Sequence, residues 1–333
     1  MNKPTEIRQT PIAVTASELA QTACAAGPPS QLSHLAVGPL AILLMPEQHA
    51  PLRWQTGRRA ARRALDDLLR RQRLLEHLLG YGDVLPVSPG EALTRGEARR
   101  FLQANSAQLC DWLVRCAGLV QFQLTIRWDQ LEARQRFPGA PGETFEQVAE
   151  GLRARFAARI RQASAAVSQL PVEGPEMLAN LVLLVDRERE DALDDALAAL
   201  DAVWPQGLRI RLAGPLPPVC FFAVQVDRLT PHGLARDRKA LGLGVGELPP
   251  RAIDRAFRLR AMALHPDRRC PSAVRPEGAD LAALTAARDR LRDAARLAAA
   301  SGGIAAPADF LNARLEGAFR QAAADAPGEG ARA

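Results

Sequence analysis

The chain has 333 residues, of which 47% are hydrophobic and 5% aromatic, and its formal net charge is +6. This length predicts two or three domains, and the scarcity of aromatic side chains argues against a platform for single-stranded nucleic acid. The longest apolar stretch, 35–45, is broken by Gly38 and Pro39 and is too short to span a membrane, and the first residues do not read as a secretory signal.

The first half of the chain alternates between extended and helical patterns. Residues 1–34 are polar and are expected to be irregular. We predict a strand over 35–44, an Arg-rich helix over 58–79, a short extended piece at 84–87, a helix over 94–117 and a strand over 119–128. In the last of these strands apolar and polar residues alternate, which is typical of a half-buried strand. The pattern therefore predicts an α+β domain over 35–136 rather than a doubly wound sheet.

A second α+β domain is predicted over 137–232. It begins with a helix whose apolar residues recur every three or four positions: Phe145, Val148, Leu152, Phe156, Ile160, Ala163 and Val167. This seam is close to a heptad and can pair with another helix, or it can pack on the domain's own sheet. A strand over 178–185, a helix over 187–203 and a strand over 208–212 follow. The second domain therefore repeats the strand–helix–strand pattern of the first.

The titratable side chains form no catalytic or metal-binding pattern. The five cysteines are scattered and include no Cys-x-x-Cys pair, so we expect reduced thiols. His34, His49, His77 and His232 have no Cys or carboxylate partner at ligand spacing, and no phosphate-binding or hydrolase motif occurs. We therefore expect no enzyme, no catalytic residues, no metal and no cofactor.

From about residue 234 the chain changes to short helices around the tripeptide His265-Pro266-Asp267. An apolar stripe on the preceding helix includes Ile253 and Phe257, and a second helix carries Leu281, Leu284, Ala287 and Leu291 on one face. Pro266 disfavours helix at His265, so Asp267 is presented on a loop as an acceptor for a partner's arginine. Residues 301–333 are expected to be mostly disordered.

This segment resembles a J-domain, the co-chaperone module of the DnaJ class, over 233–300. The resemblance implies an all-α unit that docks on a DnaK-type chaperone and stimulates its ATP hydrolysis. It assigns the contact to His265, Pro266 and Asp267, with Arg255 and Arg258 on the basic helix. The chain departs from the family pattern at Leu259, Arg260 and Arg288, so a degenerate, inactive J-like domain remains an alternative.

The region 35–226 resembles the gas vesicle GvpL/GvpF family. The resemblance rests on three ordered segments: Asp83-Val84-Leu85-Pro86-Val87, the strand 180–187, and Gly214-Pro215-Leu216-Pro217-Pro218 followed by Phe221. It implies two ferredoxin-like α+β domains with a long amphipathic or coiled-coil helix. It also implies a minor vesicle component that binds the hydrophobic shell protein during nucleation.

We therefore predict a cytoplasmic gas vesicle assembly protein fused to a J-domain. Its expected partners are the shell protein, other gas vesicle proteins and a DnaK-type chaperone, with no nucleic acid and no membrane. The client would contact the seam residues Phe145, Val148, Leu152, Phe156 and Ile160. Two alternatives remain open: a general J-domain co-chaperone for another client, and a structural shell component with a vestigial J-like tail.

Overall fold

The computed structural model describes residues 7–26, 32–46, 58–244, 249–264, 281–300 and 309–316. The chain divides into two compact units. The sheet unit draws on Gln9–Ala92 and Cys110–Gln225, and the helical unit draws on Leu93–Leu109 and Val226–Arg314. The protein is therefore a mixed α+β protein with antiparallel four-stranded sheets, as the sequence predicts, and each unit is described separately below.

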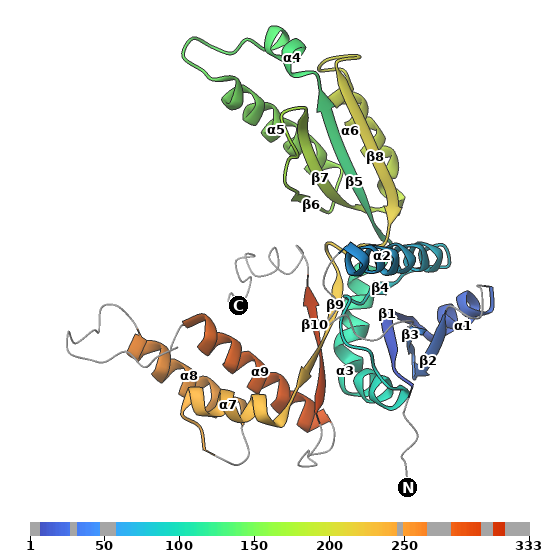
Figure 1. The fold of residues 1–333 in the computed structure, drawn as a ribbon, viewed down its shortest axis with the longest axis vertical. Coiled ribbons are helices and arrows are strands. Elements are labelled where there is room, and N and C mark those ends of the chain that lie inside the picture. Colours follow the sequence, from blue (N-terminus) through green and yellow to red (C-terminus); the bar gives the residue numbers. More distant parts are fainter. Residues whose placement is uncertain are drawn as a thin grey trace, which may run out of the picture. The chain divides into compact units, whose positions relative to one another are not determined.

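The first four-stranded sheet has a strand–helix–strand–strand–helix–strand order. Its elements are β1 (Gln9–Ala16), α1 (Ser17–Ala26), β2 (Ser33–Val37), β3 (Leu40–Pro46), α2 (Arg58–Leu79) and β4 (Leu85–Pro86). The strands lie in the order β2-β3-β1-β4, and each neighbouring pair is antiparallel (Figure 1). Helix α2 matches the predicted helix over 58–79.

Two expectations for this region are wrong. The segment 1–34, expected to be irregular, contains β1 and α1, because Ile12, Ala13 and Val14 are fully buried between β3 and β4. The apolar stretch 35–44, expected to be one strand, is a hairpin of β2 and β3. Its turn lies at Gly38, whose φ of 59° falls in the left-handed region that glycine adopts without strain.

Only some of the leucines along α2 contribute to the core. Leu75 and Leu79 are buried, whereas Leu65 and Leu68 remain 54% and 52% exposed. Helix α3 (Arg95–Cys116) is the next helix in the chain, in agreement with the predicted helix over 94–117.

The second sheet repeats the same element order. It contains β5 (Leu119–Trp128), α4 (Gln130–Arg136), α5 (Phe145–Gln162), β6 (Ala166–Gln169), β7 (Met177–Asp186), the 3-10 turn Arg187–Arg189, α6 (Glu190–Asp201) and β8 (Leu208–Leu216). The strand order is β6-β7-β5-β8, again with antiparallel neighbours, so the strand predicted over 119–128 within the domain 35–136 belongs to the second sheet instead. The predicted alternation in β5 is confirmed, because Val120, Phe122 and Leu124 are buried while Gln123 and Thr125 are partly exposed.

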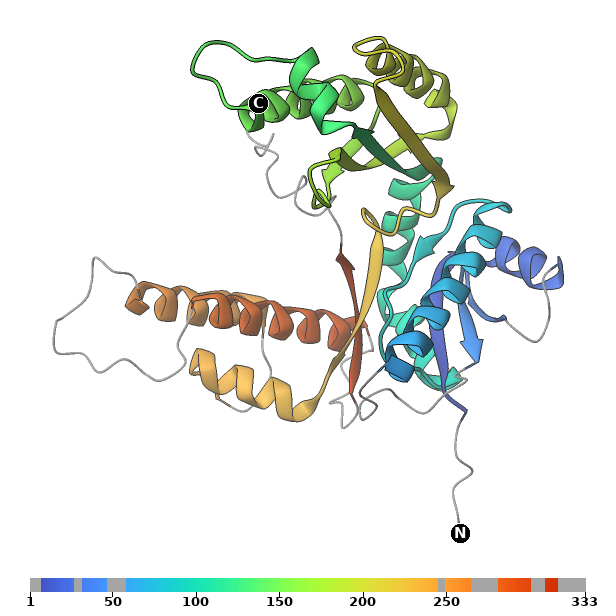
Figure 2. The ribbon, with the colours of Figure 1, turned by 45° about the horizontal axis from the view of Figure 1, so that its top comes forward.

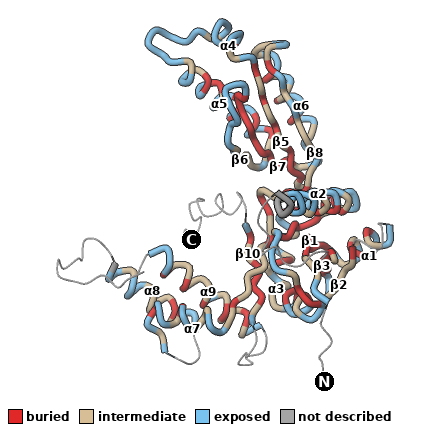
Figure 3. Tube along the Cα trace, viewed as in Figure 1, coloured by how far each residue is buried: buried red, intermediate tan, exposed pale blue. Residues whose placement is uncertain are grey.

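Helices α5 and α6 pack on one face of this sheet (Figure 2). The burial pattern in Figure 3 follows from that arrangement, with buried positions concentrated along β5 and β7. The predicted seam helix is shorter than expected. It ends at Gln162, and Val167 lies in β6, so the last part of the seam belongs to the sheet rather than to a coiled coil.

Within the described residues the helical unit contains most of α3, three further helices and a two-stranded sheet. The helices are α7 (Pro231–Leu241), α8 (Pro250–Leu264) and α9 (Leu281–Ala300), and the strands are β9 (Ala223–Leu229) and β10 (Phe310–Glu316). Strand β10 lies beside β9 in both ribbon views (Figures 1 and 2). The expectation of a mostly disordered tail from residue 301 is therefore wrong for Phe310–Glu316, where the alternating residues Leu311, Ala313 and Leu315 are buried.

Candidate functional site

The three helices α7, α8 and α9 enclose a small apolar core. It contains Leu241, Ile253, Leu284, Ala287 and Leu291, and Phe257 packs against it. The predicted inward face of the last helix is thus confirmed at Leu284, Ala287 and Leu291, whereas Leu281 at the helix start is 52% exposed.

The ends of α7 follow from recognisable capping residues. The Thr230 side chain accepts a hydrogen bond from the Gly233 N–H, and Pro231 occupies the first turn. Gly242 ends the helix in the left-handed conformation, with φ of 73°. Strand β9 ends at Leu229, so Thr230 alone separates it from α7.

Helix α8 supplies the basic surface that the sequence predicts. Arg255 and Arg258 are exposed on it, together with Arg251. The helix ends at Leu264, directly before the tripeptide. His265, Pro266 and Asp267 themselves lie outside the described residues, so their predicted contact with a chaperone stays a prediction.

The three departures from the J-domain pattern have defined surroundings. Leu259 is 62% exposed and Arg260 is also exposed, so neither contributes to the helical core. The Arg288 guanidinium lies 4.5 Å from the centre of the Phe257 ring, and Arg288 also donates to the Asp289 carboxylate. A cation–π contact therefore joins α8 and α9 at this position.

An ion pair that the sequence did not reveal joins α7 to α9. Asp237 is 3% exposed, and its two carboxylate oxygens each accept a hydrogen bond of 2.7 Å from Arg290. These hydrogen bonds raise the pKa of Arg290 above its ordinary value. A spacing of 53 residues gave no local signal for this contact.

A second polar network ties α9 to α3 and β10. Asn105 is fully buried on α3; its amide nitrogen donates to the Leu311 carbonyl at 2.9 Å, and its amide oxygen accepts from the Ala313 N–H at 3.1 Å. Arg296 donates to Asn312 at 2.6 Å and to Asn105 at 3.3 Å. The helical unit therefore depends on residues far outside the segment 233–300.

The proposed client-binding seam is largely interior. Leu152, Phe156 and Ile160 are between 0% and 4% exposed and belong to the core beneath the second sheet. Phe145 stacks on Trp128 with ring centres 5.4 Å apart, and Val148 packs against the same core. The structure favours the alternative in which the seam packs on its own sheet, and client binding through it stays a prediction.

The described ranges hold no group of three side chains arranged for a metal ion, and none of their helices is long and apolar enough to cross a membrane. Cys24, Cys110, Cys116 and Cys220 are free thiols. Burial raises the pKa of the Cys116 thiol to about 12, with a further contribution from the negative charge of Asp83.

The fold defines an antiparallel α+β protein with two sheets of the same topology and a three-helix unit. Residues 140–223 match the family model of the gas vesicle synthesis protein GvpL/GvpF. This segment runs from before α5 to the start of β9, so it includes two of the three sequence segments that carried the resemblance. The match supports the predicted resemblance to that family.

Among solved structures, the chain is similar to the gas vesicle protein GvpF from Anabaena sp. PCC7120, with 18% identity and a TM-score of 0.50. The match covers 64% of this chain and 94% of that chain, and at this identity it supports the fold alone. GvpF from Microcystis aeruginosa also matches, with 13% identity, a TM-score of 0.44 and coverage of 64% and 97%. No curated protein matches the chain in sequence.

Proposed function

We propose that the chain is a gas vesicle assembly protein that binds the hydrophobic shell protein during nucleation. The observation that carries this proposal is the family match over 140–223. The fold supports it, because the chain shares the architecture of a gas vesicle protein over almost the whole length of that protein. We also infer that both sheets are ferredoxin-like, from their common element and strand order.

We further propose that α7, α8 and α9 form a J-domain that recruits a DnaK-type ATPase chaperone. Three observations support this: a packed three-helix core, an α8 that ends directly before His265, and exposed Arg255 and Arg258 on α8. Coupling this unit to the sheet unit would give shell-protein handling access to an ATP-driven cycle. The protein would act in the cytoplasm, during the assembly of gas vesicles.

One observation favours a second candidate, a structural vesicle component with a vestigial J-like unit. Leu259 is 62% exposed at a position where the J-domain resemblance calls for a basic residue, which reduces the charge of the α8 surface. A general co-chaperone for another client is the third candidate, and the family match is the argument against it.

A binding experiment tests the gas vesicle proposal. The full chain, immobilised, should retain the purified shell protein and slow its aggregation without ATP. The variants Leu152→Glu and Phe156→Glu should lose helical circular dichroism as well as binding, because they place unpaired carboxylates in a core. Retention of fold with loss of binding would instead make the seam a client face, and no retention by the unmodified chain would defeat the proposal.

A chaperone ATPase assay tests the J-domain proposal in the full chain. Stimulation should disappear in His265→Gln and in Asp267→Asn and should fall in Arg258→Gln. Lys239→Gln is the matched control, because it removes an exposed positive charge from α7 rather than α8. Stimulation that survives both changes in the tripeptide would show that the contact lies elsewhere, and no stimulation by the unmodified chain would favour the vestigial unit.

A further inference from the structure

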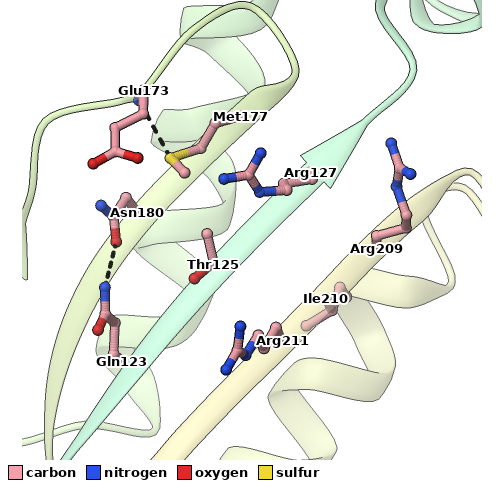
Figure 4. Close-up of a pocket in the computed structure, with 9 residues that line it drawn as sticks. All are labelled: Gln123, Thr125, Arg127, Glu173, Met177, Asn180, Arg209, Ile210 and Arg211. Carbon is pink, nitrogen blue, oxygen red and sulfur yellow. Dashed lines mark hydrogen bonds between the residues drawn. The ribbon is translucent and has the colours of Figure 1, made fainter.

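The face of the second sheet that α5 and α6 leave uncovered contains a hollow of about 420 Å³ (Figure 4). Three arginines line it: Arg127 on β5, and Arg209 and Arg211 on β8. Polar side chains of β5 and β7, among them Thr125 and Asn180, form its floor. We call Arg127, Arg209 and Arg211 the arginine face.

The arginine face carries three positive charges that no carboxylate of the described residues pairs with. Arg127 and Arg209 are direct cross-strand neighbours, and Arg211 lies two residues further along the same side of β8. Like charges directly opposite each other destabilise a sheet. Glu173 lines the same hollow, yet within the described residues none of the three arginines forms an ion pair with it or with another carboxylate.

Helix α6 carries a complementary set of carboxylates. Asp191, Asp194 and Asp195 are exposed, and none forms an ion pair in the part of the chain that the structure describes. They are spaced i, i+3 and i+4, so they share one side of the helix. The opposite side carries Leu193 and Ala196, which pack into the core. We call Asp191, Asp194 and Asp195 the aspartate face.

The two faces match in dimension. Side chains at positions i and i+2 of a strand lie about 6.6–6.8 Å apart, and cross-strand neighbours lie about 4.5–5.5 Å apart. Residues three and four apart on a helix have Cβ atoms about 5–6 Å apart. The arginine positions are therefore about 5–8 Å apart and the aspartate positions about 5–6 Å apart, a difference that the long arginine side chains can span.

The two faces cannot meet within one molecule, because they lie on opposite sides of the same layer. Helix α6 packs on the side of the sheet that holds Leu208, whereas Arg209 and Arg211 project from the other side (Figure 4). Each copy thus has an unsatisfied positive surface and an unsatisfied negative surface that point away from each other.

We propose that the aspartate face of one copy docks on the arginine face of a second copy of this chain. Such a contact joins two different surfaces, so it is heterologous and extends head to tail unless its rotation closes a ring. It is held mainly by exposed charges, and its affinity falls as salt rises. The inference does not depend on the proposed function.

Charge reversal tests this contact in the full chain. One variant carries Arg127→Glu, Arg209→Glu and Arg211→Glu, and the other carries Asp191→Lys, Asp194→Lys and Asp195→Lys. In sedimentation velocity at about 10 mM salt the unmodified chain should associate, and at about 0.5 M salt it should dissociate. Each variant alone should associate about tenfold more weakly or worse, and an equimolar mixture of the two should recover association.

The equimolar mixture is the most informative measurement, because association can recover only if both variants are folded and the two faces are in contact. Arg99→Glu with Arg100→Glu, two exposed arginines of α3, is the matched control and should leave association unchanged. Glutamine at the three arginine positions should also weaken association, without reversing charge. A monomeric unmodified chain at low salt, association that persists in both variants, or capture of an acidic peptide without self-association would each overturn the proposal.

Discussion

Arg290 on α9 donates hydrogen bonds of 2.7 Å to both carboxylate oxygens of Asp237 on α7. Asp237 keeps only 3% of its surface in solvent, whereas the Arg290 side chain keeps 33%. The carboxylate thus depends on this arginine for its hydrogen bonds, and the paired geometry fixes how α7 lies along α9.

Asp237→Asn should lower the free energy of unfolding of the helical unit by about 2–3 kcal/mol, because a buried, paired charge is lost and one forked hydrogen bond cannot form. Urea denaturation followed by circular dichroism measures the change. Arg292→Ala is the control: its ion pair with Asp254 spans 3.7 Å at an exposed position, and its loss should change stability by less than about 1 kcal/mol. Equal effects of the two changes would contradict the assigned role of Asp237.

Asn105→Leu should loosen β10. The substitution keeps the branched shape and the number of side-chain heavy atoms but leaves the Leu311 carbonyl and the Ala313 N–H without their partner in a buried position, which should cost about 2–3 kcal/mol. Hydrogen exchange of the peptide that contains Ala313 should accelerate. The exposed residue Gln103 on the same helix provides the control, and Gln103→Leu should leave that exchange unchanged.

Arg71 should be essential to the first sheet. Arg71 is 7% exposed, and its guanidinium donates to the carbonyls of Pro11, Ile12 and Val87, beside an irregularity in β1 where the pairing register shifts. Burial lowers the pKa of Arg71 to about 10. Arg71→Met should lower the melting temperature strongly, and Arg71→Lys should lower it less, because an ammonium group keeps the charge but lacks the fork. If the Lys variant and the unmodified chain had equal melting temperatures, the several hydrogen bonds of the planar guanidinium would not be what stabilises the sheet.

Cys116 should resist alkylation in the folded protein. The thiolate is the reactive form, and burial raises the pKa of Cys116 from 9.0 to about 12. Because the folded pKa is the higher one, the thiol's stabilising contribution is complete below pH 9 and is lost as pH rises toward about 12. Iodoacetamide labelling at pH 8, read by mass spectrometry, should modify the partly exposed Cys110 well before Cys116. Labelling of both at one rate would contradict the buried thiol.

The elements that could be predicted from the sequence are those with a strong local period. Helices α2 and α3 have nearly the predicted ends, and β5 shows the expected alternation. Strand β1 was missed because its apolar run is only three residues long, Ile12 to Val14, and polar residues and Pro11 surround it. Strand β10 was missed because the tail composition suggested disorder, although Leu311, Ala313 and Leu315 alternate.

The candidate site was predictable in part for the same reason. The basic surface of α8 and the inward face of α9 follow from helical periodicity, and both are present. The contacts that hold the helices in place do not follow from periodicity. In the sequence, Asp237 and Arg290 look like ordinary surface charges, because the two residues are 53 positions apart. The apolar seam of α5 could be predicted from the sequence, but its burial could not, because the burial depends on the sheet on which the helix packs.

The Asn105 contact also determines when the protein can be completed during translation. The amide of Asn105 bonds to a residue 206 positions later, and at about 5–20 residues per second that partner leaves the ribosome roughly 10–40 s afterwards. The strands of the second sheet are all made within that interval. The second sheet can therefore form first, while the amide of Asn105 stays hydrated until β10, the last strand of the described residues, has been synthesised.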